Sequence, residues 1–174
     1  EHFDAFKSYN YPPLAEAGIN INYNHSSLFR PNLKEVEYFS GFNAGVSTIV
    51  FFPGITIDHL VHMFNNPQIK ILILLTYGSG NLPLNDQLID LIQKQIKKGK
   101  IIVNLSQCIA GKVDQSKYET GRQLESVGVI GAEDMTFEAL ISKSMLLLKK
   151  YKDVKEISKM LLHPLSGEIS TLDT

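Results

Sequence analysis

The residues best suited to bind a ligand are polar, uncharged and gathered in three short groups, each of which follows a β-branched run. The groups are Phe52-Pro53-Gly54, Thr76-Tyr77-Gly78-Ser79-Gly80-Asn81 and Ser106-Gln107-Cys108. They offer hydroxyl, amide and backbone donors but no carboxylate, and this set favours a small polar or zwitterionic ligand over a metal ion. Taken one group at a time, the same Gly and Asn residues are equally typical of tight turns.

Cys108 is the single cysteine of the chain, so it cannot form an internal disulfide. A catalytic thiol needs a neighbouring base, and the nearest histidines in the sequence, His59 and His62, fall on an earlier helix. We therefore expect Cys108 to be a small apolar residue buried at the end of a strand. The two histidines lie three residues apart on one helical face, but a metal site needs further ligands. We expect no metal.

The stretch Gly78-Ser79-Gly80 resembles the start of a dinucleotide-binding fingerprint. Pro83 stands where the third glycine belongs, and no acidic residue follows about twenty positions later at a strand end. The sequence therefore argues against a nicotinamide or flavin, and we expect no cofactor.

The composition excludes several function classes. The 174 residues include 17 basic and 18 acidic side chains, so no basic excess is available to neutralise nucleic-acid phosphates. The longest apolar runs, such as residues 69–75, have fewer than half the residues needed to cross a bilayer. One cysteine and no apolar leader indicate a reducing compartment. We expect a cytoplasmic protein that binds neither nucleic acid nor membrane.

The elements that must position these groups are strands and helices in alternation. Residues 1–44, with three of the seven prolines and many Asn and Tyr, have the composition of an irregular linker, so we expect a domain boundary after Ala44. Beyond it, the pattern predicts strands at 45–52, 71–76, 101–105 and 127–131. It also predicts a short helix that starts at Thr56 or Asp58, and four further helices at 83–98, 115–126, 136–150 and 153–162. The economical assembly is an α/β fold with four parallel strands flanked by helices.

This architecture predicts where a ligand binds. In open parallel sheets, ligands collect outside the carboxyl ends of the strands, where the N-termini of the following helices also point. The three polar groups each follow a predicted strand. We therefore expect all three to meet at one edge of the sheet.

Six stretches in this order carry a family resemblance. They are Phe3-Asp4-Ala5-Phe6, Asn10-Tyr11-Pro12-Pro13-Leu14, Tyr77-Gly78-Ser79-Gly80-Asn81, Val103-Asn104-Leu105-Ser106-Gln107-Cys108, Tyr118-Glu119-Thr120-Gly121 and Gly128-Val129-Ile130-Gly131-Ala132-Glu133-Asp134-Met135-Thr136. Together they resemble the second half of the cytoplasmic, type I bacterial L-asparaginases, over essentially the whole chain. Six ordered motifs are far more specific than any single one.

The resemblance implies a fold and an activity. Residues 45–174 look like the family's C-terminal domain, which is flavodoxin-like, and residues 1–44 like the end of its N-terminal domain plus the interdomain linker. The implied protein is a homodimeric or homotetrameric amidohydrolase that converts L-asparagine to L-aspartate and ammonia through an acyl-enzyme on a threonine. The family's Thr-Gly-Gly-Thr and Thr-Asp-Lys motifs have no counterpart in this sequence. No catalytic residue is carried over, and we expect this segment alone to be inactive.

The resemblance also implies two binding roles. The Gly-x-Gly-Asn loop completes the active site across the subunit interface, which nominates Asn81, with Tyr77 nearby, as substrate-binding residues. A regulatory asparagine site between subunits corresponds to Ser106, Gln107 and Cys108. In the family an arginine is expected just before the stretch that corresponds to Thr76-Tyr77-Gly78, and here Leu75 stands in its place. Arginine is the residue that would pair with an effector carboxylate. We therefore expect weak or absent effector binding.

Two alternatives stay open at this point. The first is a non-catalytic module that binds an amino acid or only holds subunits together. The second is a relative of the same fold, the ammonia-generating subunit of the archaeal tRNA-dependent amidotransferase. A threonine-based motif upstream of Glu1 would indicate hydrolysis, whereas an added small barrel domain would indicate the amidotransferase.

Overall fold

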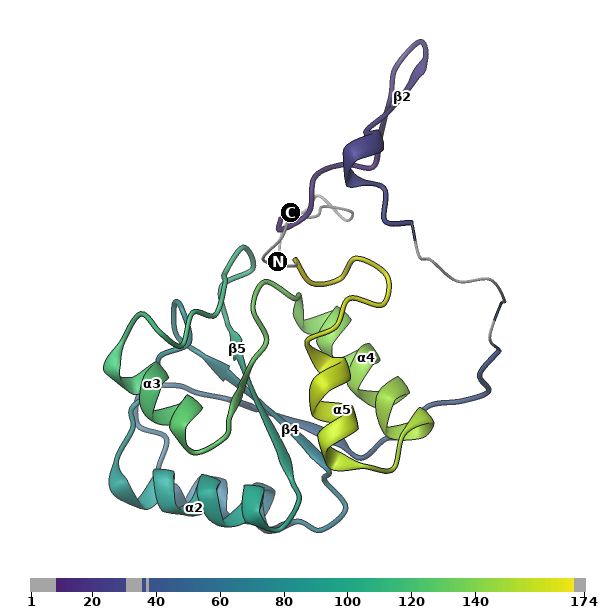
Figure 1. Ribbon diagram of the computed structural model, residues 1–174. Coiled ribbons are helices and arrows are strands. Elements are labelled where there is room, and N and C mark those ends of the chain that lie inside the picture. Colours follow the sequence, from purple (N-terminus) through teal and green to yellow (C-terminus); the bar gives the residue numbers. More distant parts are fainter. Residues whose placement is uncertain (1–8, 31–35, 37, 171–174) are drawn as a thin grey trace.

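The computed structural model describes residues 9–30, 36 and 38–170. Its centre is a four-stranded parallel sheet with helices on both faces (Figure 1), which confirms the predicted α/β fold. The strand order is β3 (Val46–Val50), β4 (Ile71–Thr76), β5 (Ile101–Ser106) and β6 (Ile130–Gly131). Each strand of this sheet pairs with the next one along the chain. All three pairs are parallel, so the carboxyl ends of the four strands lie at one edge.

The helices form two layers because the strands bury alternate side chains on opposite faces. The crossover helices are α1 (Ile57–Asn65), α2 (Asp86–Lys97) and α3 (Glu119–Ser126). They pack on the face that carries Leu72 and Leu74. The other face carries Ile71 and Ile73 and is covered by α4 (Phe137–Lys150) and α5 (Val154–Leu161). Each fully buried Leu or Ile stabilises the fold by roughly 1.5–3 kcal/mol.

Capping residues decide where the helices begin. Asn85 accepts a hydrogen bond from the backbone N–H of Leu88 at 2.9 Å, so α2 begins at Asp86, three residues after the predicted start. Asp114 bonds to the N–H and hydroxyl of Ser116, and this local turn delays α3 from the predicted residue 115 to Glu119. Local side-chain hydrogen bonds therefore competed successfully with helix in both segments.

His59 closes the first turn of α1. Its Nδ1 accepts a hydrogen bond from the backbone N–H of Thr56 at 3.1 Å in a capping box, which places the helix start at one of the two predicted positions. His62 is exposed in the last turn. Among the described residues, no group of three or more His, Cys, Asp or Glu side chains is placed to hold a metal ion.

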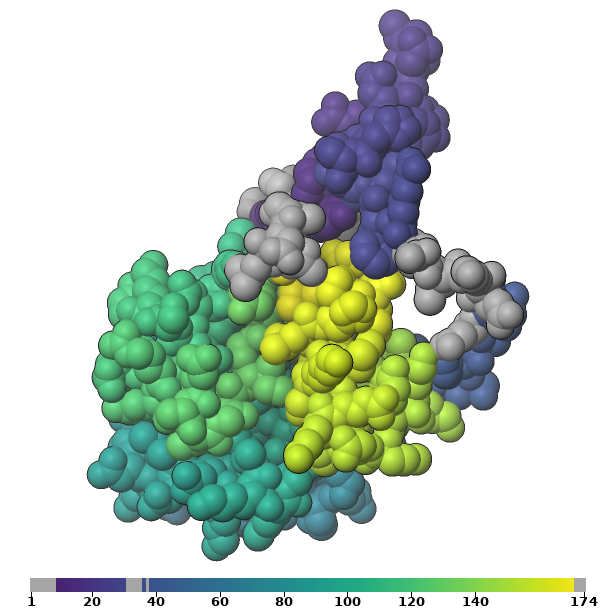
Figure 2. Space-filling view, viewed as in Figure 1, coloured from purple at the N-terminus to yellow at the C-terminus, as the bar shows by residue number. Residues whose placement is uncertain are grey.

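The first 44 residues contain an element that the sequence did not predict. Strands β1 (Ala15–Ala17) and β2 (Ile21–Tyr23) form an antiparallel hairpin, followed by a 3-10 turn, η1 (His25–Ser27). The expectation of an irregular linker was wrong there, because Gly18 to Asn20 supply a tight turn in which Gly18 N–H donates to Asn20 C=O. The hairpin projects away from the body (Figures 1 and 2). Residues 1–8, 31–35 and 37 of the predicted linker lie outside the described residues.

The segment after α5 returns to the base of this hairpin. Glu168 in this segment forms an ion pair with the buried Lys143 of α4, with 2.6 Å between Oε1 and Nζ. A groove of about 630 Å³ separates residues 165–168 from residues 11–14 and 27–29. The space-filling view shows the yellow C-terminal segment directly below the purple hairpin (Figure 2). No described helix is both long and apolar enough to cross a membrane.

Candidate functional site

The three polar groups meet at the carboxyl edge of the sheet, and Gln107 is the side chain that joins them. Its Nε2 donates to the carbonyl of Phe51, directly after β3, at a distance of 2.7 Å. It also donates to the carbonyl of Leu75, near the end of β4, at a distance of 2.9 Å. Its backbone N–H donates to the carbonyl of Thr76 at 2.8 Å. This arrangement confirms that the three turns share one edge.

Ser106 connects the third group to the second. Its hydroxyl donates to the carbonyl of Gly78 at 2.6 Å and accepts from the backbone N–H of Cys108 at 3.0 Å. The chain then folds back so tightly that a Cβ on Gly111 would lie 2.3 Å from the Ser106 hydroxyl oxygen. The hydroxyl of Ser106 is therefore committed to holding two turns together.

The Tyr77 to Asn81 loop is a tight turn closed by its own backbone. Tyr77 and Asn81 form an antiparallel bridge, with N–H to carbonyl distances of 2.7 and 2.8 Å. Gly80 is buried and has a φ of +108°. Only glycine adopts that conformation at little cost, so the sequence's second loop glycine is a conformational requirement.

A buried asparagine that sequence reasoning did not single out as a site residue holds this loop from below. Asn104, fully buried in β5, donates from Nδ2 to the carbonyl of Gly80 at 2.9 Å. Its Oδ1 accepts the hydroxyl hydrogen of Thr76 at 2.6 Å. Polar residues in the middle of a buried strand are the signal that could have identified it, because a buried amide needs partners.

Asn81 is held in a fixed orientation by a residue of α3. The Thr120 hydroxyl donates to Asn81 Oδ1 at 2.6 Å. The bond engages the amide oxygen and fixes the orientation of the amide group, whose NH₂ is its hydrogen-bond donor. Thr120 lies 39 residues away in the sequence, and no local pattern links the two.

The other nominated residues lie in different surroundings. The Tyr77 side chain packs against the core under α1 and α2, and its hydroxyl is buried without a hydrogen-bond partner among the described residues. Leu75 packs on the opposite face, against the core under α4 and α5, and only its backbone carbonyl joins the edge. Since Leu75 pairs with Leu105 in register and Ser106 with Thr76, the Leu75 and Ser106 side chains leave the sheet on opposite faces.

Cys108 is exposed, so the expectation of a buried cysteine was wrong. Strand β5 ends at Ser106, and residues 107–110 form an exposed turn beyond the sheet. A thiol outside the last strand pair has no core to pack into. Among the described residues, no hydrogen bond joins a hydroxyl or thiol of the three turns to a histidine.

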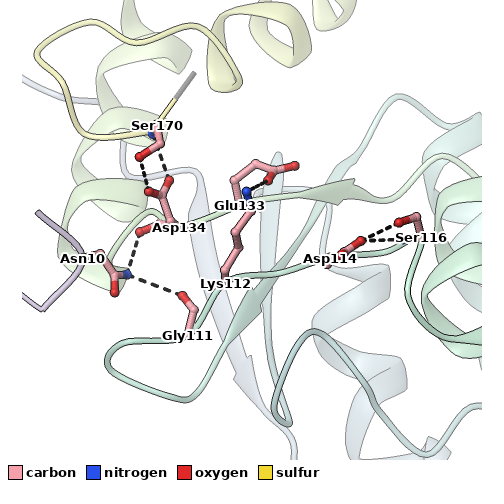
Figure 3. A network of polar contacts seen from close by, with 8 residues as sticks. All are labelled: Asn10, Gly111, Lys112, Asp114, Ser116, Glu133, Asp134 and Ser170. Atoms are coloured by element: carbon pink, nitrogen blue, oxygen red, sulfur yellow. Dashed lines mark hydrogen bonds and ion pairs between the residues drawn. The ribbon is translucent and has the colours of Figure 1, made fainter. Parts of the chain in front are cut away.

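The charged side chains of Lys112, Asp114 and Glu133 lie in the segments next to the edge, and each of them makes a polar contact there (Figure 3). Lys112 and Glu133 form an ion pair at 3.4 Å. Hydrogen bonds from Ser116 hold the pKa of Asp114 below its ordinary value, and the backbone N–H of Asp114 donates to the carbonyl of Ser79 at 3.1 Å. The edge itself is polar and uncharged, which suits binding of a neutral amide or a zwitterion and provides no activated nucleophile.

Comparison with known proteins places the chain in a family. Residues 45–161 match the family model described as the glutaminase/asparaginase C-terminal domain. L-asparaginase 1 of Escherichia coli is 37% identical over 171 residues, which are 98% of this chain and 50% of that protein. The chain therefore spans half the length of this relative.

The chain is also similar to a solved asparaginase structure and to a subunit of a different enzyme. The crystal structure of L-asparaginase I from Vibrio cholerae superposes with a TM-score of 0.86 and 34% identity, over 98% of this chain and 52% of that one. A glutamyl-tRNA(Gln) amidotransferase subunit of Methanopyrus kandleri is 31% identical over 95% of this chain and 37% of that protein.

Proposed function

The chain belongs to the glutaminase/asparaginase C-terminal domain family, and from this premise we propose that it works as the C-terminal part of a cytoplasmic L-asparaginase. In this proposal the protein hydrolyses L-asparagine to L-aspartate and ammonia. The nucleophilic threonine comes from a part of the protein outside these 174 residues. This segment supplies binding groups, so the purified segment alone is inactive.

The observation that carries the proposal is the uncharged polar edge at which three turns converge on Gln107. Asparagine is a zwitterion, and an amide can bind its ammonium or carboxylate group without adding charge. Asn81 is the group that contacts substrate, with its amide orientation fixed by Thr120. Tyr77 supports the loop that carries Asn81 through their backbone bridge.

The surroundings of the edge support completion of the site by a second subunit. Phe52, in the first of the three turns, and Ile109, directly after the third, are 49% and 57% exposed. These apolar side chains are available to pack against a second subunit. We propose a homo-oligomer, a dimer or a tetramer, in which this edge faces the active site of a neighbouring subunit.

The second part of the proposal concerns the effector site at Ser106, Gln107 and Cys108. We propose that this site binds an asparagine effector weakly or not at all. The hydroxyl of Ser106 and the amide of Gln107 already bond to backbone carbonyls. Leu75 offers no positive charge to a carboxylate, and its side chain lies on the other face of the sheet. A sigmoidal response to asparagine that Leu75→Arg leaves unchanged would contradict this.

The decisive experiment measures asparagine hydrolysis by the full-length protein. Asn81→Ala removes the proposed substrate contact, and we expect kcat/KM to fall about 10- to 100-fold. Thr120→Val leaves the amide in place without its orienting hydroxyl, and we expect a smaller loss. Gln87→Ala removes an exposed amide of α2 that lies outside the three turns; it is the control and leaves kcat/KM unchanged. Equal activity of the Asn81→Ala and Gln87→Ala variants would overturn the assignment of Asn81.

One alternative is supported by a specific observation, because glutamyl-tRNA(Gln) amidotransferase subunits from several organisms match 95–98% of this chain at 30–32% identity. In that case the ammonia would be passed to a tRNA-bound substrate. Hydrolysis of free asparagine without tRNA supports the asparaginase. Ammonia release that requires a charged tRNA supports the amidotransferase.

A further inference from the structure

A second polar pocket lies at the opposite end of the sheet, where the strands begin. It has a volume of about 240 Å³ and lies between the α1–β4 and α2–β5 connections. Its polar side chains are those of Asn65, Asn66, Lys70, Gln95, Lys98 and Lys100. The candidate site described above follows the strands, so the two sites are separated by the length of the sheet.

The strand register places two lysines side by side. Lys70 and Lys100 immediately precede β4 and β5, whose first residues, Ile71 and Ile101, are paired. The backbone N–H of Ile101 donates to the carbonyl of Lys70 at 2.9 Å, which continues the ladder by one residue. Paired residues of parallel strands lie about 4.8 Å apart and point to the same side. The third lysine, Lys98, joins them from the end of α2.

The three ammonium groups have no counter-charge in the described part of the chain. No carboxylate there lies within 4.0 Å of Lys70, Lys98 or Lys100. The Nζ atoms of Lys100 and Lys70 each donate to one carbonyl, at 2.8 Å, and an ammonium carries three donors.

Lys100 is the buried member, with 8% of its surface exposed. Burial lowers the pKa of Lys100, and repulsion from Lys70 and then Lys98 lowers it further. Desolvation and like-charge repulsion therefore both disfavour the charged form of Lys100.

The helix ends nearby explain only part of this charge. Helices α1 and α2 both end beside the pocket, and a helix C-terminus carries about −0.5 elementary charge. A helix end stabilises a nearby cation by only about 0.3–1 kcal/mol, so the two ends do not neutralise three lysines. The cluster stays positively charged and favours an anion.

We propose that this pocket binds an oxyanion of the phosphate class, held by the ammonium groups of Lys70, Lys98 and Lys100. Phosphate oxygens accept charge-assisted hydrogen bonds from such groups. The pocket has room for the phosphate group, either as free phosphate or as the terminal phosphate of a larger molecule that extends into solvent. The proposal does not depend on the proposed hydrolytic activity.

Calorimetry and thermal unfolding of the purified protein test this site. We expect inorganic phosphate to raise the unfolding midpoint more than sodium chloride does at matched ionic strength. In the Lys70→Gln/Lys98→Gln variant, whose changed side chains are both exposed, we expect at least about tenfold weaker phosphate binding. The Lys112→Gln/Lys117→Gln control makes the same charge change in the segment beside the carboxyl edge and keeps wild-type binding.

Two results would overturn the proposal. One is equal phosphate affinity in the Lys70→Gln/Lys98→Gln variant and the wild type. The other is a shift of the unfolding midpoint that chloride reproduces at the same ionic strength. Glycerol phosphate distinguishes the two sources of the anion. Affinity equal to that for inorganic phosphate indicates a terminal phosphate, and markedly weaker affinity indicates the free ion.

Discussion

At the scale of single residues, Gln107 connects the three turns of the candidate site. One amide nitrogen donates to the carbonyls of Phe51 and Leu75, and the backbone of the same residue pairs with Thr76. A side-chain amide can do this because its NH₂ carries two donors and no charge. The meeting of the three turns therefore depends on a donor group that no carboxylate can replace.

The substitution Gln107→Glu tests this dependence. A carboxylate would face two carbonyl oxygens and could accept but not donate, so we expect the free energy of unfolding to fall by about 1–3 kcal/mol. Denaturant unfolding measures the change. Cys108→Ser, at the next exposed position, is the control and changes stability by less than about 0.5 kcal/mol. An equal effect of both substitutions would refute the role given to Gln107.

At the scale of elements, the Tyr77 to Asn81 loop gains its shape from two glycines in different surroundings. Both have positive φ, +51° at Gly78 and +108° at Gly80. A Cβ on Gly78 would meet nothing within 4 Å, whereas one on Gly80 would lie 2.9 Å from Asn104 Nδ2 and 3.0 Å from Val113 Cγ1. The loop is thus open on one side and pressed against β5 on the other.

This difference predicts unequal effects of two alanine substitutions. Gly78→Ala incurs only the backbone penalty, and we expect a loss of about 1–2 kcal/mol. Gly80→Ala adds a steric clash with Asn104, and we expect a loss of about 2–4 kcal/mol. Thermal or denaturant unfolding of the two variants provides the comparison. Equal losses would show that Asn104 moves aside easily and does not hold the loop.

At the scale of the whole molecule, the Lys143–Glu168 ion pair ties the C-terminal segment to the body. The Lys143 side chain is 3% exposed and its Nζ also donates to the carbonyl of His163 at 2.7 Å. Burial alone would raise the pKa of Glu168, but hydrogen bonds from Lys143 and from backbone N–H groups outweigh it and leave the pKa below its ordinary value. Burial lowers the pKa of Lys143, which Glu168 only partly offsets.

The pair predicts a sensitivity to acid. Because the pKa of Glu168 is lower in the folded state than in the unfolded state, its contribution to stability is present above the unfolded pKa and is lost as the pH falls through the folded one. We expect Glu168→Gln to lower the free energy of unfolding by about 3–5 kcal/mol at neutral pH, since it leaves Lys143 buried without its partner.

The double variant Lys143→Met/Glu168→Leu separates pairing from packing. We expect it to recover part of the stability lost in Glu168→Gln, because an apolar pair of similar volume replaces the ions. The recovery is incomplete because the backbone N–H groups of Leu165 and Ser166 lose the carboxylate that accepted their hydrogen bonds. It should also show a flatter loss of stability in acid than the wild type. An acid profile identical to that of the wild type would contradict the role of Glu168.

Local pattern was sufficient to predict most of the sheet and its helices. The run of residues 71–76 was predicted with its observed bounds, because a strand buried on both faces is almost entirely aliphatic. Helix α2 was also recognisable from the helical spacing of its apolar residues, although its predicted start was three residues too early. The hairpin of residues 15–23 was missed because its two strands have only three residues each, too few to establish a period, and both are wholly exposed.

The sequence by itself determined that polar, uncharged turns follow successive parallel strands and therefore share an edge, because chain order and right-handed crossovers leave few other arrangements. Only the tertiary structure decided which side chains act there. Thr120 reaches Asn81 and Asn104 reaches Gly80 across 39 and 24 residues, and Leu75 and Ser106 lie on opposite faces. Such contacts depend on strand register and helix rotation, and these are set by packing of the whole core.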